Sequence, residues 1–311
     1  MDKKIGIVFT SRNNYELFDN WFKKTDTTGY QILNIDEDST EEQKALGKLV
    51  CKKHGITYLD RENRGMLWNL LTACNHYESL NKEYLLYFSH DCYPKTEDFF
   101  NKLNTLVTEK DLSSFGAIGF NILHDDREIS QWNGDSTLLH HVARTPLEPG
   151  DLYYRSNRFW PNTRVRFDDK FKKPFAVESI MWTSGLLNIK QYKTHIIPTS
   201  DYHMFHSWDD LCFQFLNKNI YNIVLPDFCL AHEQRSKIEF GIPKSSPSNE
   251  HGKREHYFSK FNHLEVFQER WGFDYGNRNT FEPVKHAYEN TLLYQFYNHD
   301  PLNGPLKSFD I

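Results

Sequence analysis

The sequence predicts an α/β fold built on a parallel, doubly wound sheet. Across residues 4–91, short apolar runs typical of strands alternate with longer stretches that have helical spacing. Strands that alternate with helices in this way pair in parallel, because each helix carries the chain back to the same edge of the sheet. The apolar content of 39% and the charged content of 25% fit one large globular domain, alone or with an appendage.

The elements of this first part follow one another with clear boundaries. The run Ile5 to Phe9 is continuously apolar, as a buried strand requires. Ser39 or Thr40 provides a capping signature for the second helix, and Gly55 ends it. The expected strands are residues 4–11, 30–39, 56–65 and 83–91, and the expected helices are residues 12–24, 39–55 and 66–80.

Beyond Pro94 the pattern is looser. Residues 124–175 are polar, aromatic and rich in arginine, and an irregular segment of that length is usually functional or partly disordered. Residues 237–256 are expected to be mobile. Further strands are expected at residues 115–123, 178–189 and 219–233, and helices at residues 207–219 and 262–272. We therefore expect a main domain, residues 1–235, with a helical and irregular C-terminal extension, residues 236–311, packed on it.

Composition excludes several classes of protein. The net charge of −5 argues against a broadly basic surface for nucleic acid. No apolar run approaches the ~20 residues that span a bilayer, and the first residues lack the apolar region of a signal peptide. The five cysteines are odd in number and scattered, which indicates reduced thiols. We expect a cytoplasmic protein without a transmembrane segment.

Polar residues follow several of the expected strands. Ligands of doubly wound sheets bind at the carboxyl ends of the strands, so Asp36, Asn63 and Asp91 are expected to converge. A carboxylate at the tip of a buried strand is unfavourable unless it is paired, solvated or bound to a cation. Mg²⁺ or Mn²⁺ bridging two phosphates is a natural partner for Asp91. The plainer alternatives are an acidic turn at Asp36 and a loop cap at Asp91, and His90 is either a second ligand or faces the other side of its strand.

Two later segments add candidate residues. Gly65 precedes a helix and lets phosphates approach its backbone N–H groups, and Asn69 lies on the second turn of that helix. Asp209 and Asp210 begin another helix, where adjacent carboxylates cannot point the same way. One of them can therefore face a site as a general base while the other caps the helix. The strand that follows ends at His232, which could complete a metal site with Asp91.

In this order, the features resemble the nucleotide-sugar glycosyltransferases of GT-A fold, family 2 in particular. The resemblance covers roughly residues 3–235 and rests on "VFTSRNNYELF", "ILNIDEDSTEE", "NRGMLWNLL", "YLLYFSHDCYPKTEDFF" and "DDLCFQFLNKNIYNIVLPDFCLAHE". The DxD metal motif of the family reads Ser89-His90-Asp91 here, so its first carboxylate is missing. One alignment of the acidic helix puts Trp208 at the position of the base, and the other puts Asp209 there.

The resemblance implies a GT-A (Rossmann-like), mostly parallel sheet flanked by helices. It also implies inverting transfer of a hexosyl or pentosyl group from a nucleoside-diphosphate sugar to a glycan or polysaccharide hydroxyl. Asp209, or else Asp210, would be the base, and Asp91 with His232 would hold Mn²⁺ or Mg²⁺. The residues expected near the donor are Thr10, Arg12, Asp36, Asn63, Gly65, Asn69 and His90.

Other functions remain open from the sequence. A DNA glycosyltransferase acting on a hydroxymethylated base would use the Arg and Lys cluster at residues 155–173 for phosphates and aromatic side chains for an extruded base. Surface ion pairs are the plainer interpretation of those arginines. A third hypothesis is a nucleotide-sugar or glycan-binding domain without catalysis, because the metal motif is incomplete. A nucleotidyltransferase usually needs a basic N-terminal loop, where this chain has only Arg12.

Overall fold

The structure is a computed structural model of the 311-residue chain. It describes residues 3–62, 64–124, 151–153, 164–166, 173–180, 184–202, 207–232, 263–271, 290–298 and 307–311. The strands are β1 (Ile5–Ser11), β2 (Ile32–Glu37), β3 (Thr57–Arg61), β4 (Tyr84–Phe88), β5 (Cys92–Pro94), β6 (Ala117–His124), β7 (Asp151–Tyr153), β8 (Arg164–Arg166), β9 (Phe175–Val177), β10 (Ser184–Asn188) and β11 (Asn222–His232).

Helices connect most of these strands. They are α1 (Tyr15–Lys24), α2 (Glu41–His54), α3 (Met66–Ser79), α4 (Phe99–Glu109), α5 (Ile189–His195), α6 (Ser207–Asn217), α9 (His263–Trp271) and α10 (Leu292–Asn298). No helix within the described ranges is long and apolar enough to cross a membrane.

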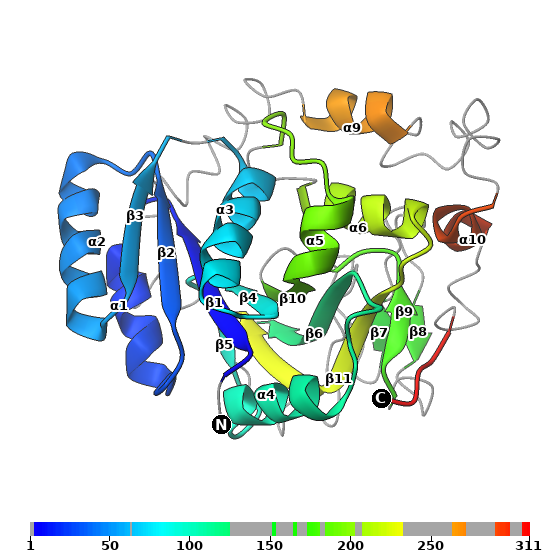
Figure 1. Cartoon of the computed structure of the whole chain (residues 1–311), viewed down its shortest axis with the longest axis horizontal. Helices are drawn as coiled ribbons and strands as arrows, with labels where there is room; N and C mark the ends of the chain where they lie inside the picture. The colour runs from blue at the N-terminus through cyan, green and yellow to red at the C-terminus, as the bar shows by residue number, and fades with distance from the viewer. Residues whose placement is uncertain are drawn as a thin grey trace.

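One mixed sheet forms the centre of the molecule (Figure 1). Its strand order is β3-β2-β1-β4-β10-β6-β11-β5, and β9 also pairs with β11. The strands β3, β2, β1 and β4 are parallel, as are β6 and β11, whereas β10 runs antiparallel between β4 and β6. The predicted α/β class with a mostly parallel, helix-flanked sheet is confirmed.

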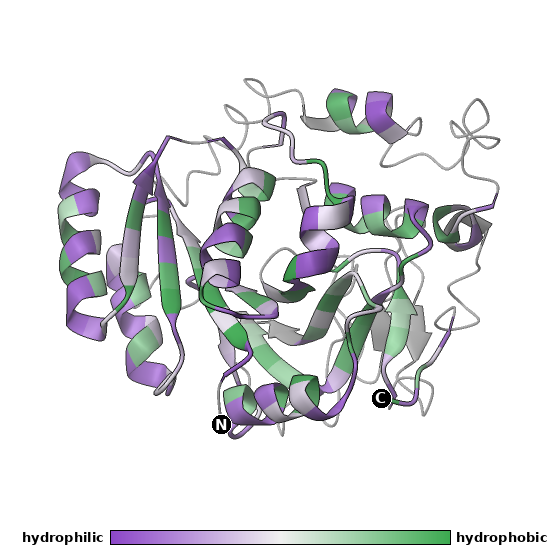
Figure 2. Cartoon of the chain, viewed as in Figure 1, coloured by the Kyte–Doolittle hydropathy of each residue, from purple (hydrophilic) through white to green (hydrophobic). Residues whose placement is uncertain are grey.

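The two faces of the sheet carry separate apolar cores. Side chains alternate along each strand, so Leu85 and Tyr87 of β4 pack with α3, α5 and α6, whereas Leu86 and Phe88 pack with α1 and α4. Figure 2 shows the matching pattern, with apolar strands inside and helices that carry hydrophilic residues on their outer sides. The carboxyl ends of β1, β2 and β4 therefore present residues to two different helix layers.

The expected boundaries of α2 are confirmed. Thr40 is its N-cap, and the Thr40 hydroxyl accepts a hydrogen bond of 3.3 Å from the backbone N–H of Gln43. Gly55 ends the helix in the left-handed region at φ 67°, which glycine adopts without steric strain.

The second half departs from the sequence prediction in its details. The expected strand 178–189 is only Ser184–Asn188, and α5 follows it directly, with the Asn188 side chain accepting a 2.9 Å hydrogen bond from the N–H of Gln191. The helices α4, α5 and α10 were not expected. Most of the segment 124–175 and all of 237–256 lie outside the described residues.

The C-terminal residues pack on the main sheet. The backbone N–H of Ala176 in β9 donates to the carbonyl of Lys307, and the N–H of Phe309 donates to the carbonyl of Pro174. Phe267 and Trp271 of α9 are buried against α6. The boundary expected at residue 235 falls in a segment outside the described residues and stays a prediction.

Candidate functional site

The polar residues at the carboxyl ends of β1, β2 and β4 separate onto the two faces of the sheet, because neighbouring strand residues point to opposite sides. The residues on the side of α1 are Ser11, Asn34, Asp36 and His90. The residues on the side of α3 are Thr10, Glu37 and Tyr87.

Asp36 is fully buried on the α1 side, with an exposed fraction of 0%. One of its carboxylate oxygens accepts hydrogen bonds from the hydroxyls of Tyr15 and Tyr58, the latter at 2.9 Å. The other accepts from the backbone N–H of Ser39 at 3.1 Å. These three protein donors match the acidic-turn alternative, and they leave the carboxylate no exposed surface toward a ligand.

His90 also faces α1. Its Nε2 lies 2.7 Å from the hydroxyl of Ser11, and its ring stacks on Phe18 with 4.6 Å between the ring centroids and 24° between the planes. The histidine therefore turns to the face opposite α3, as the alternation of strand side chains allows.

Glu37 is the buried carboxyl on the α3 side, with an exposed fraction of 8%. Burial raises the pKa of Glu37 to about 7, although Asn69 beside it and the charge of Arg12 lower that pKa. Within the described part of the chain, Oε1 of Glu37 accepts no hydrogen bond of normal geometry, and Nδ2 of Asn69 donates none, although the amide lies near enough to the carboxyl to lower its pKa. A buried acceptor and a buried donor without such bonds are unfavourable, and such pairs are typical of ligand sites.

Tyr87 connects this carboxyl with two other candidates. Burial raises the pKa of Tyr87, and the carboxylates of Asp91 and Glu37 raise it further. On its other side, the ring of Tyr87 lies 5.5 Å from the ring of Trp208, measured between centroids. The charges of Glu37 and Asp91 therefore act on Tyr87, and Trp208 at the start of α6 packs against its ring.

Asp91 lies in the turn between β4 and β5 and has an exposed fraction of 7%. Its carboxylate accepts a 2.7 Å hydrogen bond from the Ser89 hydroxyl, and the N–H of Cys92 closes the turn onto the carbonyl of Ser89. Cys92 pairs with His232 in the sheet, so the backbone of His232 lies beside the residue that follows Asp91.

The donor set for a metal ion is incomplete in the described residues. No group of three His, Cys, Asp or Glu side chains lies together there, and the side chain of His232 is outside the described part. The carboxylate of Asp91 is the hard oxygen ligand that Mg²⁺ and Mn²⁺ prefer. It fits a cation whose remaining ligands come from phosphate oxygens and water.

The two acids at the start of α6 have different surroundings. Asp210 is fully buried, and its carboxylate accepts hydrogen bonds from Trp271 Nε1 at 2.8 Å and Gln214 Nε2 at 2.7 Å, with Arg270 Nε at 3.2 Å. Burial raises the pKa of Asp210 to about 6, against the lowering effect of Arg270. Asp209 is partly exposed and accepts a 2.7 Å hydrogen bond from the Ser179 hydroxyl.

The remaining predicted residues lie around α3 and β1. Gly65 precedes α3 at φ 91°, a backbone conformation that favours glycine, and Arg12 is exposed after β1. Thr10 donates a long hydrogen bond of 3.4 Å to Tyr87. Asn63 lies outside the described residues, as do the side chains of the arginines between 155 and 166.

Sequence reasoning missed Glu37, Tyr87 and Ser179. For Glu37, a usable signal was present. The strand "ILNIDE" places Leu33, Ile35 and Glu37 on one face and Asp36 on the other, and the alternation of β4 puts Tyr87 with the first group. Ser179 could not be found in this way, because it lies outside any regular element and reaches Asp209 only through the tertiary fold.

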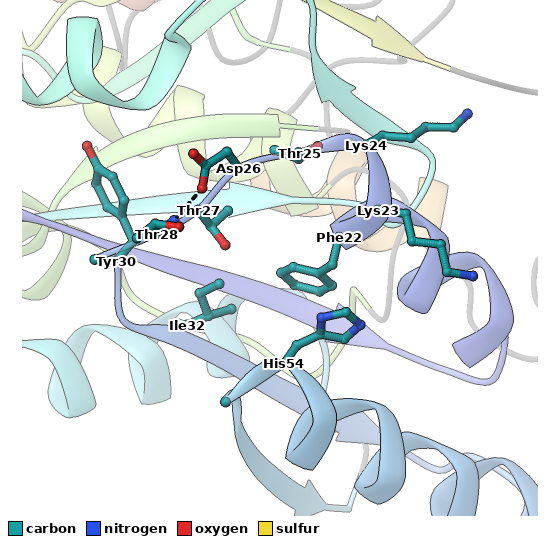
Figure 3. Close-up of a pocket in the computed structure, with 12 residues that line it drawn as sticks. Phe22, Lys23, Lys24, Thr25, Asp26, Thr27, Thr28, Tyr30, Ile32 and His54 are labelled. Atoms are coloured by element: carbon teal, nitrogen blue, oxygen red, sulfur yellow. Dashed lines mark hydrogen bonds between the residues drawn. The ribbon is translucent and has the colours of Figure 1, made fainter.

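A separate hollow of about 550 Å³ lies at the other end of β2 (Figure 3). Phe22 and His54 face one another in it, with their ring centroids 4.9 Å apart. Its charged groups already have partners in the protein. Lys23 and His54 bind Asp19, Lys24 lies over the ring of Tyr93, and Asp26 accepts a hydrogen bond from the N–H of Thr28. The hollow borders Ile32, the first residue of β2, whereas Glu37 is the last. It is therefore distinct from the candidate site.

Comparison with known proteins identifies the fold. No family model matches the sequence, and no curated protein sequence matches it either. The structure is similar to that of GalNAc-T7 with UDP, GalNAc and Mn²⁺, with a TM-score of 0.55 and 10% identity over 94% of this chain and 55% of that one. TarS of S. aureus, residues 1–349, aligns with a TM-score of 0.46 and 10% identity over 75% of this chain and 61% of that one. The chain thus spans about half the length of the first structure, and it has the GT-A fold.

Proposed function

We propose that this protein is a glycosyltransferase that moves a hexosyl or pentosyl group from a nucleoside diphosphate to a glycan hydroxyl. The observation that carries the proposal is the set of groups that act on Tyr87. On a GT-A fold, the charges of Glu37 and Asp91 act on this residue, and Trp208 at the acid-bearing start of α6 packs against its ring. GT-A sheets, like other doubly wound sheets, bind ligands beyond the carboxyl ends of their strands.

Glu37 and Asn69 are our candidates for binding the nucleoside. A carboxylate acceptor and a neighbouring amide donor that form no hydrogen bond of normal geometry within the protein match a base edge that offers one N–H and one carbonyl oxygen. We assign this contact to Glu37 and no longer to Asp36, because the carboxylate of Asp36 is buried and accepts three hydrogen bonds from the protein. Gly65 at the start of α3 leaves room for a phosphate near the backbone N–H groups of that helix.

Asp91 and His232 are the residues that would hold Mn²⁺ or Mg²⁺. When bound, the cation would neutralise the charge that develops on the leaving diphosphate. UDP and Mn²⁺ are named with the GalNAc-T7 structure, which supports a nucleotide donor and a divalent cation here as well.

Asp209 is our candidate for the general base, and Asp210 is a structural anchor. Asp209 is partly exposed, whereas the carboxylate of Asp210 is enclosed by Gln214, Trp271 and Arg270. In the reaction, Asp209 accepts the proton of the acceptor hydroxyl while the oxygen attacks the anomeric carbon. The bond from that carbon to the diphosphate oxygen breaks, and the diphosphate leaves with the electron pair. One such displacement inverts the anomeric configuration, and base assistance contributes about 10²–10⁴-fold.

A panel of nucleotide sugars, with and without Mn²⁺, tests the proposal. We expect at least one nucleotide sugar to raise the melting temperature of the protein and to be hydrolysed slowly. We expect Mn²⁺ to increase both the stabilisation and the hydrolysis, and we expect Asp91→Ala to abolish these two increases. Asp227→Ala, which removes an exposed carboxylate, is the matched control and should behave as the wild type. Failure of every donor to bind would contradict the proposal, and binding without any hydrolysis or transfer would indicate a binding domain instead.

A further inference from the structure

A continuous chain of hydrogen bonds runs across the carboxyl ends of β4, β1 and β2 on the α1 side. It begins at His90, whose Nε2 lies 2.7 Å from the Ser11 hydroxyl, and continues from Ser11 to Oδ1 of Asn34. Nδ2 of Asn34 lies 3.1 Å from the Tyr15 hydroxyl, which bonds to Asp36. Three strands that are separate in sequence are thus joined through side chains alone.

Asp36 fixes the direction of this chain. Its carboxylate acts only as an acceptor, for the N–H of Ser39 and for the hydroxyls of Tyr58 and Tyr15. The single hydroxyl hydrogen of Tyr15 is therefore donated to Asp36. Tyr15 must then accept its other hydrogen bond, and the nitrogen of the Asn34 amide supplies it.

The same reasoning extends to His90. With its amide nitrogen toward Tyr15, Asn34 turns its oxygen toward Ser11, which donates its only hydroxyl hydrogen there. Ser11 can then only accept from His90, so Nε2 of His90 carries a proton. A protonated Nε2 does not bind a metal ion, and the ring as a whole stacks on Phe18 on the α1 side of the sheet.

The chain ends in the turn that carries Asp91. On one side of this turn, His90 stacks on Phe18, and Trp21 Nε1 donates a 2.7 Å hydrogen bond to the carbonyl of Cys92. On the other side, the Ser89 hydroxyl binds the Asp91 carboxylate. The turn is therefore held from both faces of the sheet.

We propose that Asp36 and His90 are positioning residues, which hold the Asp91 carboxylate in place through this chain and bind neither the nucleotide nor the cation. The inference rests on the proposed function, because that function assigns Asp91 to the cation. Hydrogen-bond partners behind a metal ligand typically contribute about 10–100-fold in metal affinity.

Tyr15→Phe and Tyr58→Phe form a matched pair that tests the proposal. Each substitution removes one hydroxyl that donates to Asp36, but only Tyr15 belongs to the chain. Calorimetry with Mn²⁺ alone should show affinity about tenfold weaker for Tyr15→Phe and within about twofold of wild type for Tyr58→Phe. ¹⁵N NMR should show a proton on Nε2 of His90 in the wild type and in Tyr58→Phe, with its resonance shifted or lost in Tyr15→Phe.

A second pair covers the case in which Tyr15→Phe folds poorly. His90→Gln keeps an N–H donor near the position of Nε2 and should retain most of the Mn²⁺ affinity, whereas the shorter His90→Asn should lose it. The proposal would be overturned if Tyr15→Phe and Tyr58→Phe, or His90→Gln and His90→Asn, changed the Mn²⁺ affinity equally. It would also be overturned if Nε2 of His90 carried no proton in the wild-type protein. If the wild-type protein showed no measurable affinity for Mn²⁺, the metal role in the proposed function would be contradicted. The NMR result would then still show whether the hydrogen bonds run from Asp36 to His90 as proposed.

Discussion

Glu37 and Asp210 are both carboxyl groups whose pKa is raised by burial, yet their surroundings differ. Asp210 accepts hydrogen bonds from Gln214 and Trp271 and pairs with Arg270, so the protein itself supplies its partners. For Glu37, one oxygen has no partner in the described part of the chain. The first arrangement is that of a structural anchor, and the second is that of a residue whose partner is a ligand.

Replacing Glu37 should therefore stabilise the protein and weaken nucleotide binding. The pKa of Glu37 is raised from about 4.5 to about 7, so its contribution to stability is complete below pH 4.5 and is lost as the pH rises through 7. Glutamine cannot ionise, so Glu37→Gln avoids this loss of stability at high pH. The free energy of unfolding should therefore increase by up to ~3 kcal/mol at pH 8 and change little at pH 4.

Urea denaturation at the two pH values measures this effect, and titration with nucleotides should show weaker binding. The exposed Glu97→Gln is the control and should change the free energy of unfolding by less than about 0.5 kcal/mol. A Glu37→Gln variant that is no more stable than wild type at pH 8 would show that the carboxyl is not held in an unfavourable environment.

Asp209→Asn and Asp210→Asn should have opposite profiles. Asp209→Asn should lower kcat by about 10²–10⁴-fold with unchanged stability and donor affinity, because Ser179 can still donate to the amide oxygen. Asp210→Asn should destabilise the fold by about 1–3 kcal/mol, because an amide nitrogen would face the donors on Gln214, Trp271 or Arg270. Steady-state kinetics and thermal unfolding separate the two, and normal turnover by Asp209→Asn would exclude it as the base.

The alternation of strand residues explains which site residues the sequence could predict. Asp36, His90 and Asp91 were all identified as strand-end residues, which requires only the apolar runs before them. The face to which each side chain points depends on its place in the alternation along the strand. This alternation separates Asp36 and His90 from Glu37 and Tyr87. The contacts between Tyr87 and Trp208 or Ser179 and Asp209 join distant parts of the chain, so no local pattern contains them.

At the scale of elements, the first half of the fold was predictable and the second half was not. In residues 5–88, strand-type and helix-type sequence patterns alternate, and capping residues mark the ends of helices, as Thr40 and Gly55 do for α2. The insertion of β10 antiparallel between β4 and β6 depends on pairing between distant residues. The helix α4 had a usable signal in its apolar stripe, Phe99, Phe100, Leu103 and Val107, which was overlooked.

The packing of α2 against α1 depends on a glycine inside the helix. A Cβ at Gly47 would lie 2.4 Å from the ring of Tyr15, whose hydroxyl is bound to Asp36. Alanine normally stabilises a helix by about 1 kcal/mol relative to glycine, but overpacking a core costs about 1–3 kcal/mol. Gly47→Ala should therefore lower the melting temperature.

The exposed position Ala45 on the same helix provides the control. Ala45→Gly should cost only the difference in helix propensity, about 1 kcal/mol, measured by urea denaturation. If Gly47→Ala instead raised stability by that amount, the contact with Tyr15 would not limit the approach of α1 and α2.

At the scale of the whole molecule, the C-terminal residues complete the core of the main domain. Trp271 and Arg270 of α9 bind the buried carboxylate of Asp210, and Phe267 packs on Phe213. Residues 307 and 309 extend the backbone hydrogen bonding beside β9. These contacts make the extension a part of the fold around α6, even though the segments that lead to it are outside the described residues.

A fragment of residues 1–235 should consequently fail to fold as the whole chain does. It would lose Trp271 and Arg270, the two donors that α9 provides to Asp210. Removing one partner of a buried ion pair costs about 3–5 kcal/mol. We expect the fragment to unfold without a cooperative transition in calorimetry, whereas the full chain shows one. Trp271→Ala in the full chain should lower the free energy of unfolding by about 3–5 kcal/mol, and Leu49→Ala, at a side chain that is 65% exposed, should change it by less than about 0.5 kcal/mol. A fragment that melts cooperatively at the temperature of the full chain would show that α9 rests on a core that is already complete.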